Sequence, residues 1–472
     1  MPIRYFNGLL IDCSRLMERH KYYFKLIDFM SDWKMNTLLL HFTDDHGCAV
    51  KLPGFPGLAM RNAFSSAEVK KLVNYASRKG IDIIPEVESF GHTRYLTDKA
   101  KYRNLYAGRK TKTLKFNALD PLNEKSLDII KQLLRSTSRI FKSKYIHIGC
   151  DEVNIREYCK LKGGLDEETV WADYVNKVIG SVKHMGKIPM MWGDHPGNNS
   201  KIAGLLRKDV IMVYWQYGKI KKGNIERLKK TGFKNIVLAP ALAWFLYRFL
   251  PTEEILDNTV NMIKNNAKYN TRGIINTIWC PYRYIQKALY YGIAYSSYGY
   301  YHGGKINTDK FNELFAKEVF GSELTEPLKR FLKYWPKLSV GHALSKYICS
   351  YGKYKLTDRQ KKSIININKI GKNILPVSIF YKPVKNPDIW HAMLLSAKAA
   401  WLCSEFYIIK EKKIKDKAII DKFKKLAKET VYEASKEWDK TRYSNDMQKL
   451  GPKFPGEEYQ YALVLLENLL KI

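Results

Sequence analysis

The sequence is short of acidic residues, has no paired cysteines and contains no long apolar run. Its 472 residues include seven cysteines, an odd number, and no two of them form a C-x-x-C pair. This argues against a disulfide framework and against a zinc knuckle. No run of 18 or more apolar residues occurs, so no membrane-spanning helix and no membrane partner are expected.

A secretory signal is also lacking at the start of the sequence. The residues from Met1 to Phe6 show neither the apolar stretch nor the small-residue cleavage site of a signal peptide. As written, the chain is therefore expected in the cytoplasm. A secreted location would follow only if a signal segment preceded these residues.

The charge is strongly one-sided, with 81 Lys and Arg against 46 Asp and Glu, a formal net charge of +35. Lysines are spread along the chain, which favours a solvated basic surface. The alternative is attraction to an acidic partner such as nucleic acid or a sulfated glycan. Because no nucleic-acid-binding motif accompanies the charge, no nucleic-acid partner is expected. With 45% hydrophobic residues, the composition is that of a packed globular protein.

Short apolar runs alternate with amphipathic helical patterns from residue 5 to about 300, which is typical of parallel β/α units. The predicted strands are Gly8–Cys13, Thr37–Thr43, Ile81–Val87, Tyr145–Gly149, Ile188–Trp192, Val210–Trp215, Asn235–Ala239 and Gly273–Trp279. The intervening helices are predicted at Tyr22–Trp33, Ser66–Lys79, Glu124–Phe141, Glu168–Met185 and Thr252–Lys268. Eight such strands predict a closed (β/α)8 TIM barrel, placed here in residues 1–304.

The pattern changes past residue 305 to long Lys- and Leu-rich periodic segments without strand-like runs between them. Helices are predicted at Asp309–Phe320, Leu324–Tyr334, Arg359–Ile374, Ile389–Tyr407, Ile414–Lys440 and Glu457–Ile472. Residues 305–472 are therefore predicted to form an all-helical C-terminal domain.

Polar and aromatic residues directly follow most of the predicted strands, where a barrel builds its active site. Strands one to four end in Asp12-Cys13-Ser14-Arg15, His41-Phe42-Thr43-Asp44-Asp45-His46, Glu86-Val87-Glu88-Ser89-Phe90-Gly91-His92 and Asp151-Glu152. Strands five, six and eight end in Trp192-Gly193-Asp194, Tyr214-Trp215-Gln216-Tyr217 and Trp279-Cys280-Pro281-Tyr282. If the barrel closes, carboxylates, histidines, an arginine and aromatic rings converge.

That mixture suits a sugar ring, whose apolar face packs on aromatic side chains while its hydroxyls bind Arg and Asp. Cleaving a glycoside also needs a carboxylic acid that stays protonated near neutral pH. Asp151 and Glu152 are the acids best placed for this role. Because consecutive side chains leave a strand on opposite sides, an ordinary acid and nucleophile pair is not expected from them.

Four ordered motifs resemble the catalytic domain of glycoside hydrolase family 20, the β-N-acetylhexosaminidases. They are Asp12-x-Ser14-Arg15, Lys34-Met35-Asn36-Thr37-x-x-x-His41-x-Thr43-Asp44-Asp45, Pro85-Glu86-x-x-x-x-Gly91-His92 and His147-Ile148-Gly149-Cys150-Asp151-Glu152. The Phe90-Gly91-His92 and Gly149-Cys150 variants look most like the hexosaminidase D-type branch. The resemblance covers residues 5 to about 300.

The resemblance implies a retaining exo-enzyme in which the substrate's own acetamido oxygen attacks the anomeric carbon. Glu152 would then be the general acid and later the base, and Asp151 would hold the acetamido N–H. Arg15 would bind the ring hydroxyls of the terminal sugar. His92, with Asp45 or Asp44, would orient Glu152. Trp192, Trp215 and Trp279 would form aromatic walls.

Several points stay open at this stage. The tyrosine that binds the acetamido carbonyl has candidates at Tyr214, Tyr282 and Tyr247, and Trp244 lies nearby in the sequence. No acid follows Trp279, which leaves the choice between N-acetylglucosamine and N-acetylgalactosamine open. The natural glycan, the linkage and the oligomeric state are also undetermined.

Two other functions compete with this one. The first is a non-catalytic barrel that binds glycans. The second is a metal-dependent barrel hydrolase with His41, His46 and Asp44 as ligands. On the favoured interpretation the enzyme needs no metal and no cofactor, and its partner is a glycan ending in an N-acetylhexosamine.

Overall fold

The computed structural model describes residues 5–110, 118–218, 223–249, 251–443 and 461–472. The chain divides into two compact units, which are described separately below. The first contains Met1–Ala241 and Asn261–Thr277, and the second contains Leu242–Val260 and Ile278–Ile472. The domain boundary at residue 304 stays a prediction.

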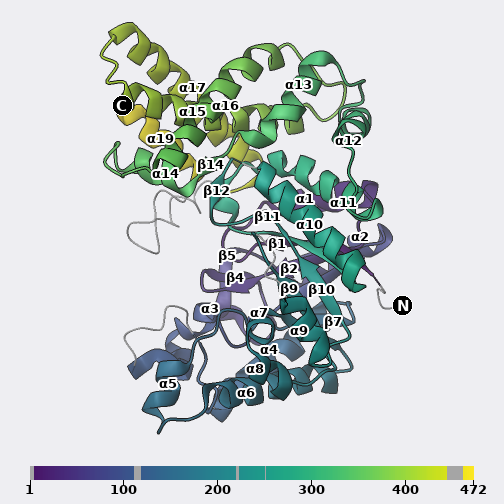
Figure 1. The fold of residues 1–472 in the computed structure, drawn as a ribbon. Coiled ribbons are helices and arrows are strands. Elements are labelled where there is room, and N and C mark those ends of the chain that lie inside the picture. The colour runs from purple at the N-terminus through teal and green to yellow at the C-terminus, as the bar shows by residue number, and fades with distance from the viewer. Residues whose placement is uncertain (1–4, 111–117, 219–222, 250, 444–460) are drawn as a thin grey trace. The chain divides into compact units, whose positions relative to one another are not determined.

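A closed barrel of eight parallel strands forms the core of the first unit (Figure 1). The strands are β1 (Phe6–Asp12), β2 (Thr37–His41), β6 (Asp82–Glu86), β7 (Tyr145–His147), β8 (Ile188–Trp192), β9 (Ile211–Trp215), β10 (Ile236–Ala239) and β13 (Gly273–Ile278). They pair in this order, and β1 closes the ring by pairing with β13. Every residue of β1 and β2 is buried, as expected of strands covered on both faces. All eight predicted strands are confirmed.

Helices connect these strands. They are α1 (His20–Asp32), α2 (Ser66–Arg78), α3 (Arg94–Thr97), α4 (Glu124–Ile140), α5 (Arg156–Leu161), α6 (Glu167–His184), α7 (Asp194–Asn198), α8 (Ser200–Leu205), α9 (Asn224–Lys230) and α10 (Glu253–Tyr269). Five of them, α1, α2, α4, α6 and α10, lie at the predicted places. Local sequence fixes several starts: Ser65 and Glu68 form a capping box on α2, and the side chain of Asp166 accepts a hydrogen bond from the Thr169 N–H at the start of α6.

A small sheet follows β2, and the sequence did not predict it. It consists of β3 (Thr43–Asp44), β4 (Gly47–Val50) and β5 (Ala59–Phe64), in that order. The antiparallel pairing of β3 with β4 places Asp44 opposite Gly47. The sheet therefore fixes the backbone that carries the acidic residues after strand two.

The second unit is mostly helical, as predicted. Its helices are α11 (Tyr290–Tyr301), α12 (Thr308–Phe315), α13 (Glu326–Tyr334), α14 (His342–Cys349), α15 (Asp358–Ser378), α16 (Pro387–Glu411), α17 (Lys417–Thr441) and α19 (Ala462–Asn468). Two short strands, β12 (Tyr247–Arg248) and β14 (Val340–Gly341), pair antiparallel, and β11 (Ala241–Ala243) follows β10. Residues 457–460 of the last predicted helix lie outside the described residues.

One helix of the second unit, α16, is long and apolar enough to cross a membrane by length and composition. However, 72% of its most apolar window is buried inside the structure. Its apolar character on all sides is therefore that of a core helix.

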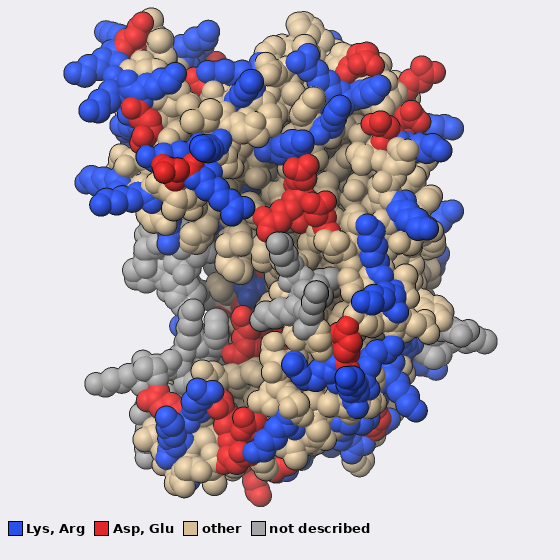
Figure 2. Space-filling model, in the orientation of Figure 1, with Lys and Arg blue, Asp and Glu red and all other residues tan. Residues whose placement is uncertain are grey.

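Lys and Arg side chains are spread over most of the face shown in Figure 2, with Asp and Glu among them. On this face the net charge of +35 is not gathered into a single patch. This distribution fits the solvated basic surface that the sequence favours.

Candidate active site

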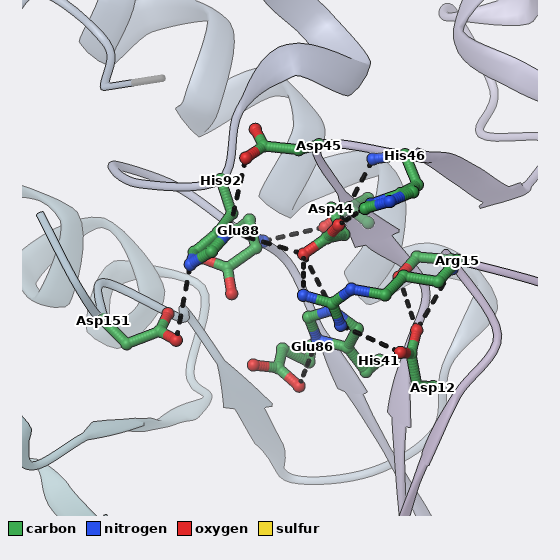
Figure 3. A network of polar contacts seen from close by, with 12 residues as sticks. Asp12, Arg15, His41, Asp44, Asp45, His46, Glu86, Glu88, His92 and Asp151 are labelled. Atoms are coloured by element: carbon green, nitrogen blue, oxygen red, sulfur yellow. Dashed lines mark hydrogen bonds and ion pairs between the residues drawn. The ribbon is translucent and has the colours of Figure 1, made fainter. Parts of the chain in front are cut away.

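Four polar residues stand in register at the carboxyl ends of adjacent barrel strands. Asp12 pairs with His41, His41 pairs with Glu86, and Glu86 pairs with His147. Acids and bases therefore alternate across β1, β2, β6 and β7. This register brings distant parts of the sequence into one polar network (Figure 3).

Arg15 is held between two buried carboxylates. Its Nη1 lies 2.8 Å from Asp12 Oδ2, and its Nη2 lies 2.9 Å from Asp44 Oδ2. Burial, the largest single cause, would raise the pKa of both acids, but the Arg15 charge and the neighbouring His41 together lower the pKa of Asp12 and, with His46 and His92 added, lower that of Asp44 more strongly. Both carboxylates are therefore ionised, and the guanidinium direction is fixed.

Glu86 lies at the centre of a second buried set. Its Oε2 is 2.9 Å from His41 Nδ1, and its Oε1 is 3.3 Å from His147 Nδ1 and accepts a 2.7 Å hydrogen bond from Trp192 Nε1. Although burial would lower the pKa of His41, the charge of Glu86 and its hydrogen bonds raise it to about 10. His41 is therefore an imidazolium that faces Glu86 and, at 3.5 Å, Asp44.

The loop after β7 leaves the extended conformation, and this brings its two acids to one side. Gly149, Cys150 and Glu152 have φ of +66°, +73° and +51°. Asp151 Oδ2 and Glu152 Oε2 lie 3.7 Å and 3.5 Å from His92 Nε2. Consecutive side chains of a strand point to opposite sides, but here both carboxylates face the same imidazole.

His92 links this loop to the acids after β2. Its Nδ1 lies 3.5 Å from Asp44 Oδ2 and 3.4 Å from Asp45 Oδ2. Burial would lower the pKa of His92, but the charge of Asp151 and hydrogen bonds to Asp45 and Glu152 raise it well above its ordinary value. Burial raises the pKa of Asp151 to about 7, even though His92 opposes the shift. Asp151 therefore titrates near neutral pH.

The residues after β8 hold the backbone of the same loop. Asp194 Oδ2 accepts a 3.0 Å hydrogen bond from the Glu152 N–H, and His195 Nε2 accepts one of 2.9 Å from the Val153 N–H. Glu152, Asp194, His195 and Trp171 also line a hollow of about 400 Å³. The side chain of Glu152 is 42% exposed, so it can reach a molecule in that hollow.

The predicted aromatic residues are placed differently from one another. Trp192 is buried, with its indole N–H on Glu86. Tyr214 is also buried, and its hydroxyl accepts a 2.8 Å hydrogen bond from Asn224 of α9. The Trp215 ring is partly exposed and lies 5.0 Å from that of Tyr217. The Tyr214 hydroxyl also donates a 3.3 Å hydrogen bond to Gln216 Oε1.

Three further predicted residues belong to the second unit. Trp244 packs against Phe245, with ring centroids 5.6 Å apart. The Trp279 N–H donates to the Ala243 carbonyl at 3.0 Å. The Tyr282 ring lies 4.7 Å from that of Tyr461. Their roles stay predictions.

Two histidine and carboxylate sets are compact enough to be considered for a metal, His41 with Glu86 and Glu88, and His92 with Asp151 and Glu152. In both, a histidine nitrogen lies within ion-pair distance of the carboxylates, at 2.9 Å for His41 Nδ1 and Glu86 and at 3.5 Å and 3.7 Å for His92 Nε2 with Glu152 and Asp151. His46, the other histidine of the metal hypothesis, has its Nδ1 2.8 Å from Asp44 Oδ1. These contacts are those of ion pairs, and the metal-dependent hydrolase stays an untested prediction.

The sequence profile of the glycosyl hydrolase family 20 catalytic domain matches residues 5–288. The chain belongs to glycosyl hydrolase family 20. The β-hexosaminidase subunit beta of Mus musculus is 27% identical over 259 residues, which cover 51% of this chain and 46% of the mouse protein. A β-hexosaminidase of Akkermansia muciniphila is 26% identical over 264 residues, with coverage of 49% and 52%. The chain thus spans about half the length of the curated relatives it matches.

A solved structure agrees at the level of the fold. The β-N-acetylhexosaminidase of Bacteroides fragilis superposes with a TM-score of 0.56 at 17% identity, over 67% of this chain and 70% of that one. The predicted barrel and the predicted helical C-terminal region are both confirmed by the strands and helices of this chain.

Some residues of this family 20 site were not among the predicted site residues. They are Asp12, Glu86, Glu88, His147, Asp194 and His195, whereas Asp44 was predicted as an alternative partner of His92, and both His41 and Asp44 as candidate metal ligands. The available signal was that each is a polar residue at or just after the end of a buried strand. What the sequence could not give is the register, which decides that Glu86 meets His41 and His147.

Proposed function

We propose that this family 20 chain is a retaining exo-β-N-acetylhexosaminidase that removes terminal N-acetylglucosamine or N-acetylgalactosamine by substrate-assisted catalysis. The names of its relatives support the activity, and the residues of the barrel mouth support the mechanism. This family departs from the usual pair of catalytic carboxylates, because the substrate supplies the nucleophile.

The observation that carries the proposal is the common orientation of Asp151 and Glu152 toward His92. Two adjacent acids on one side can serve the acetamido group and the glycosidic oxygen of a single sugar. Asp151 Oδ1 is buried and has no hydrogen-bond partner among the described residues. A buried acceptor without a partner suits a donor that arrives with the substrate, such as the acetamido N–H.

The proposed reaction has two steps. In the first, the acetamido oxygen attacks the anomeric carbon, the glycosidic bond breaks, and Glu152 gives its proton to the leaving oxygen. In the second, Glu152 takes a proton from water, which attacks the same carbon and restores the acetamido group with retained configuration. Asp151 in its ionised form stabilises the positive charge of the cyclic intermediate.

The other predicted residues take supporting roles in this proposal. Arg15, oriented by Asp12 and Asp44, binds the hydroxyls of the terminal sugar. His92, with Asp44 and Asp45, orients the two acids. Trp192 and Trp215 of the first unit are proposed to flank the sugar. The proposed reaction needs no cofactor.

Replacing each acid tests the proposal. With an aryl β-N-acetylglucosaminide, E152Q is expected to lower kcat/KM by at least about 10²-fold, because a positioned general acid contributes about 10²- to 10⁴-fold. D151N is expected to be severely impaired as well. A parallel assay with the galactosaminide measures the sugar preference.

The matched control is E313Q, which makes the same chemical change on an exposed carboxyl of α12. It is expected to retain wild-type activity. Full activity in folded E152Q would contradict the mechanism. A wild-type chain that binds a thiazoline inhibitor without hydrolysing either glycoside would favour the non-catalytic glycan-binding barrel.

A further inference from the structure

Glu88 is a buried carboxyl that the proposed reaction does not use. It follows β6 and is 1% exposed. Its backbone is held on both sides, because its N–H donates to Thr43 Oγ1 at 2.8 Å and its carbonyl accepts from the Tyr95 hydroxyl at 2.8 Å. Both of its carboxyl oxygens lack a hydrogen-bond partner among the described residues. An ionised carboxylate in that state is strongly disfavoured.

The charges around Glu88 are mostly negative. The negative charges of Asp151 and Glu86 both act on its carboxyl group, and Figure 3 draws all three side chains. The titratable groups that interact with it are His41, Asp44, Glu86, His92, Tyr95, Cys150 and Asp151. The two histidines are already paired with other carboxylates. Burial, followed by the charges of Asp151 and Glu86, raises the pKa of Glu88 well above its ordinary value.

The carboxyl group also packs directly under the loop that carries the proposed catalytic acids. A Cβ built on Gly149 would lie 2.0 Å from Glu88 Oε2. Gly149 has a φ of +66° and begins the stretch of left-handed backbone that ends at Glu152. Glu88 thus fills the space beneath the point at which this loop leaves the barrel.

We propose that Glu88 is a positioning residue that stays protonated in the working enzyme, supports the loop at Gly149, and leaves the charge near His92 to Asp151. Two ionised carboxyls at this place would compete for the same imidazolium. With Glu88 neutral, Asp151 can ionise when the positive intermediate forms. The catalytic part of this inference rests on the proposed function, whereas the protonation of Glu88 does not.

The protonation state is tested by stability as a function of pH. A group whose native pKa is raised stabilises the fold fully below its unfolded pKa and loses this contribution as the pH rises. Native wild-type protein is therefore expected to hold one more proton at Glu88 than unfolded protein at neutral pH. E88Q cannot lose that proton. Its stability relative to wild type is expected to increase as the pH rises above 4.5, the ordinary glutamate value, with a slope of at most one proton, because only the wild type loses the contribution of that proton.

Urea unfolding of wild type, E88Q and E313Q between pH 5 and 9 measures these slopes. The free energy of unfolding of E313Q is expected to change with pH as that of the wild type does, because the carboxyl of Glu313 is exposed. E88M, of similar length and without charge, serves if the amide of E88Q disturbs folding. If the free energy of unfolding changed with pH in the same way in the wild type, E88Q and E88M, Glu88 would be ionised in the native protein, and the proposal would be overturned. Metal analysis that finds a bound divalent cation, removed together with stability by chelation, would overturn it as well.

The positioning role is tested by kinetics on the aryl glycoside. E88A leaves a hole beneath Gly149 and is expected to lower kcat by about 10²-fold, the cost of misplacing a catalytic group by about 1 Å. E88Q, which refills the space, is expected to recover most of that loss. The acid-side midpoint of its kcat/KM profile is expected to match wild type, since Glu88 is neutral in both.

A downward shift of that midpoint by one pH unit or more in E88Q would mean that Glu88 is charged in the wild type, and would overturn the proposal. Equal kcat in E88A and wild type would remove the positioning role. If the wild type hydrolyses no glycoside, the proposed function fails, while the unfolding experiment still decides the protonation of Glu88.

Discussion

Two corners of the barrel mouth handle buried carboxylates in opposite ways. In the first corner, formed by Asp12, Arg15 and Asp44, the guanidinium lowers the pKa of both acids against the effect of burial. In the second corner, formed by Glu88, His92, Asp151 and Glu152, burial raises the pKa of Glu88 and Asp151. Each corner contains one basic side chain, but the first shares it between two acids and the second among three, and this difference fits the opposite pKa shifts.

The comparison separates two tasks that one pocket must perform. The first corner carries charges that do not change near neutral pH, so it can present a fixed hydrogen-bonding surface to a sugar. The second corner holds groups that can gain or lose protons at little cost, which is what acid and base chemistry requires. If this is correct, the two corners respond differently to substitution and to pH.

The largest expected effect comes from removing the cation of the first corner. R15M removes the guanidinium that pairs with the buried carboxylates of Asp12 and Asp44, and should lower the free energy of unfolding by about 3–5 kcal/mol. The control is R207M, which removes the exposed pair of Arg207 with Asp209 and should cost about 0–1 kcal/mol. Urea unfolding compares them. Equal losses would mean that the first corner is no more than a surface ion pair.

A smaller effect is expected from crowding the second corner. G149A adds a methyl group 2.0 Å from Glu88 Oε2 at a φ of +66°. G80A imposes the same backbone cost at a φ of +74°, with no heavy atom within 4 Å. G149A should therefore be about 1–3 kcal/mol less stable than G80A, the usual cost of overpacking.

The excess cost of G149A should disappear when Glu88 is replaced by alanine in the same chain. Thermal unfolding of the single and double variants measures this coupling. Additive effects would show that the loop does not rest on Glu88.

The smallest expected effect is the change of stability with pH. This change should have opposite directions for an acid of the first corner and an acid of the second corner. Asp12 has a lowered native pKa, so the advantage of wild type over D12N should shrink as the pH falls below 3.8. Asp151 has a raised native pKa. The free energy of unfolding of the wild type should therefore exceed that of D151N by less and less as the pH rises from 3.8 to about 7. Each slope is at most about 1.4 kcal/mol per pH unit. Urea unfolding of the wild type, D12N and D151N at several pH values in both ranges measures these differences. If both differences changed in the same direction with pH, the comparison of the two corners would be wrong.

Much of this molecule follows from local sequence. The eight barrel strands were predictable because each is a short apolar run between amphipathic helices, and all eight appear with shifts of a few residues at their ends. The candidate acids were predictable because Asp151 and Glu152 directly follow such a run. The family motifs added the roles that spacing alone could not assign.

The remainder depends on long-range geometry. The three short strands after β2 lack the apolar run that predicts a strand. The strand β3 has only two residues, and only the last two residues of β5 are buried. Nothing local shows that the backbone turns left-handed at Cys150 and Glu152, which is what points both acids at His92. Nor does a sequence reveal that Glu88 lies buried without a partner, because that depends on which residues surround it.

The two hydrogen bonds from Glu152 and Val153 to Asp194 and His195 have a consequence for protein engineering. The conformation of the loop that bears the proposed acids is not determined by its own sequence alone. It also depends on the neighbouring segment after β8. Grafting the first segment onto another barrel should require both segments to be transplanted together. Substitutions at Asp194 and His195 should therefore alter turnover, although neither residue is proposed to bind the sugar.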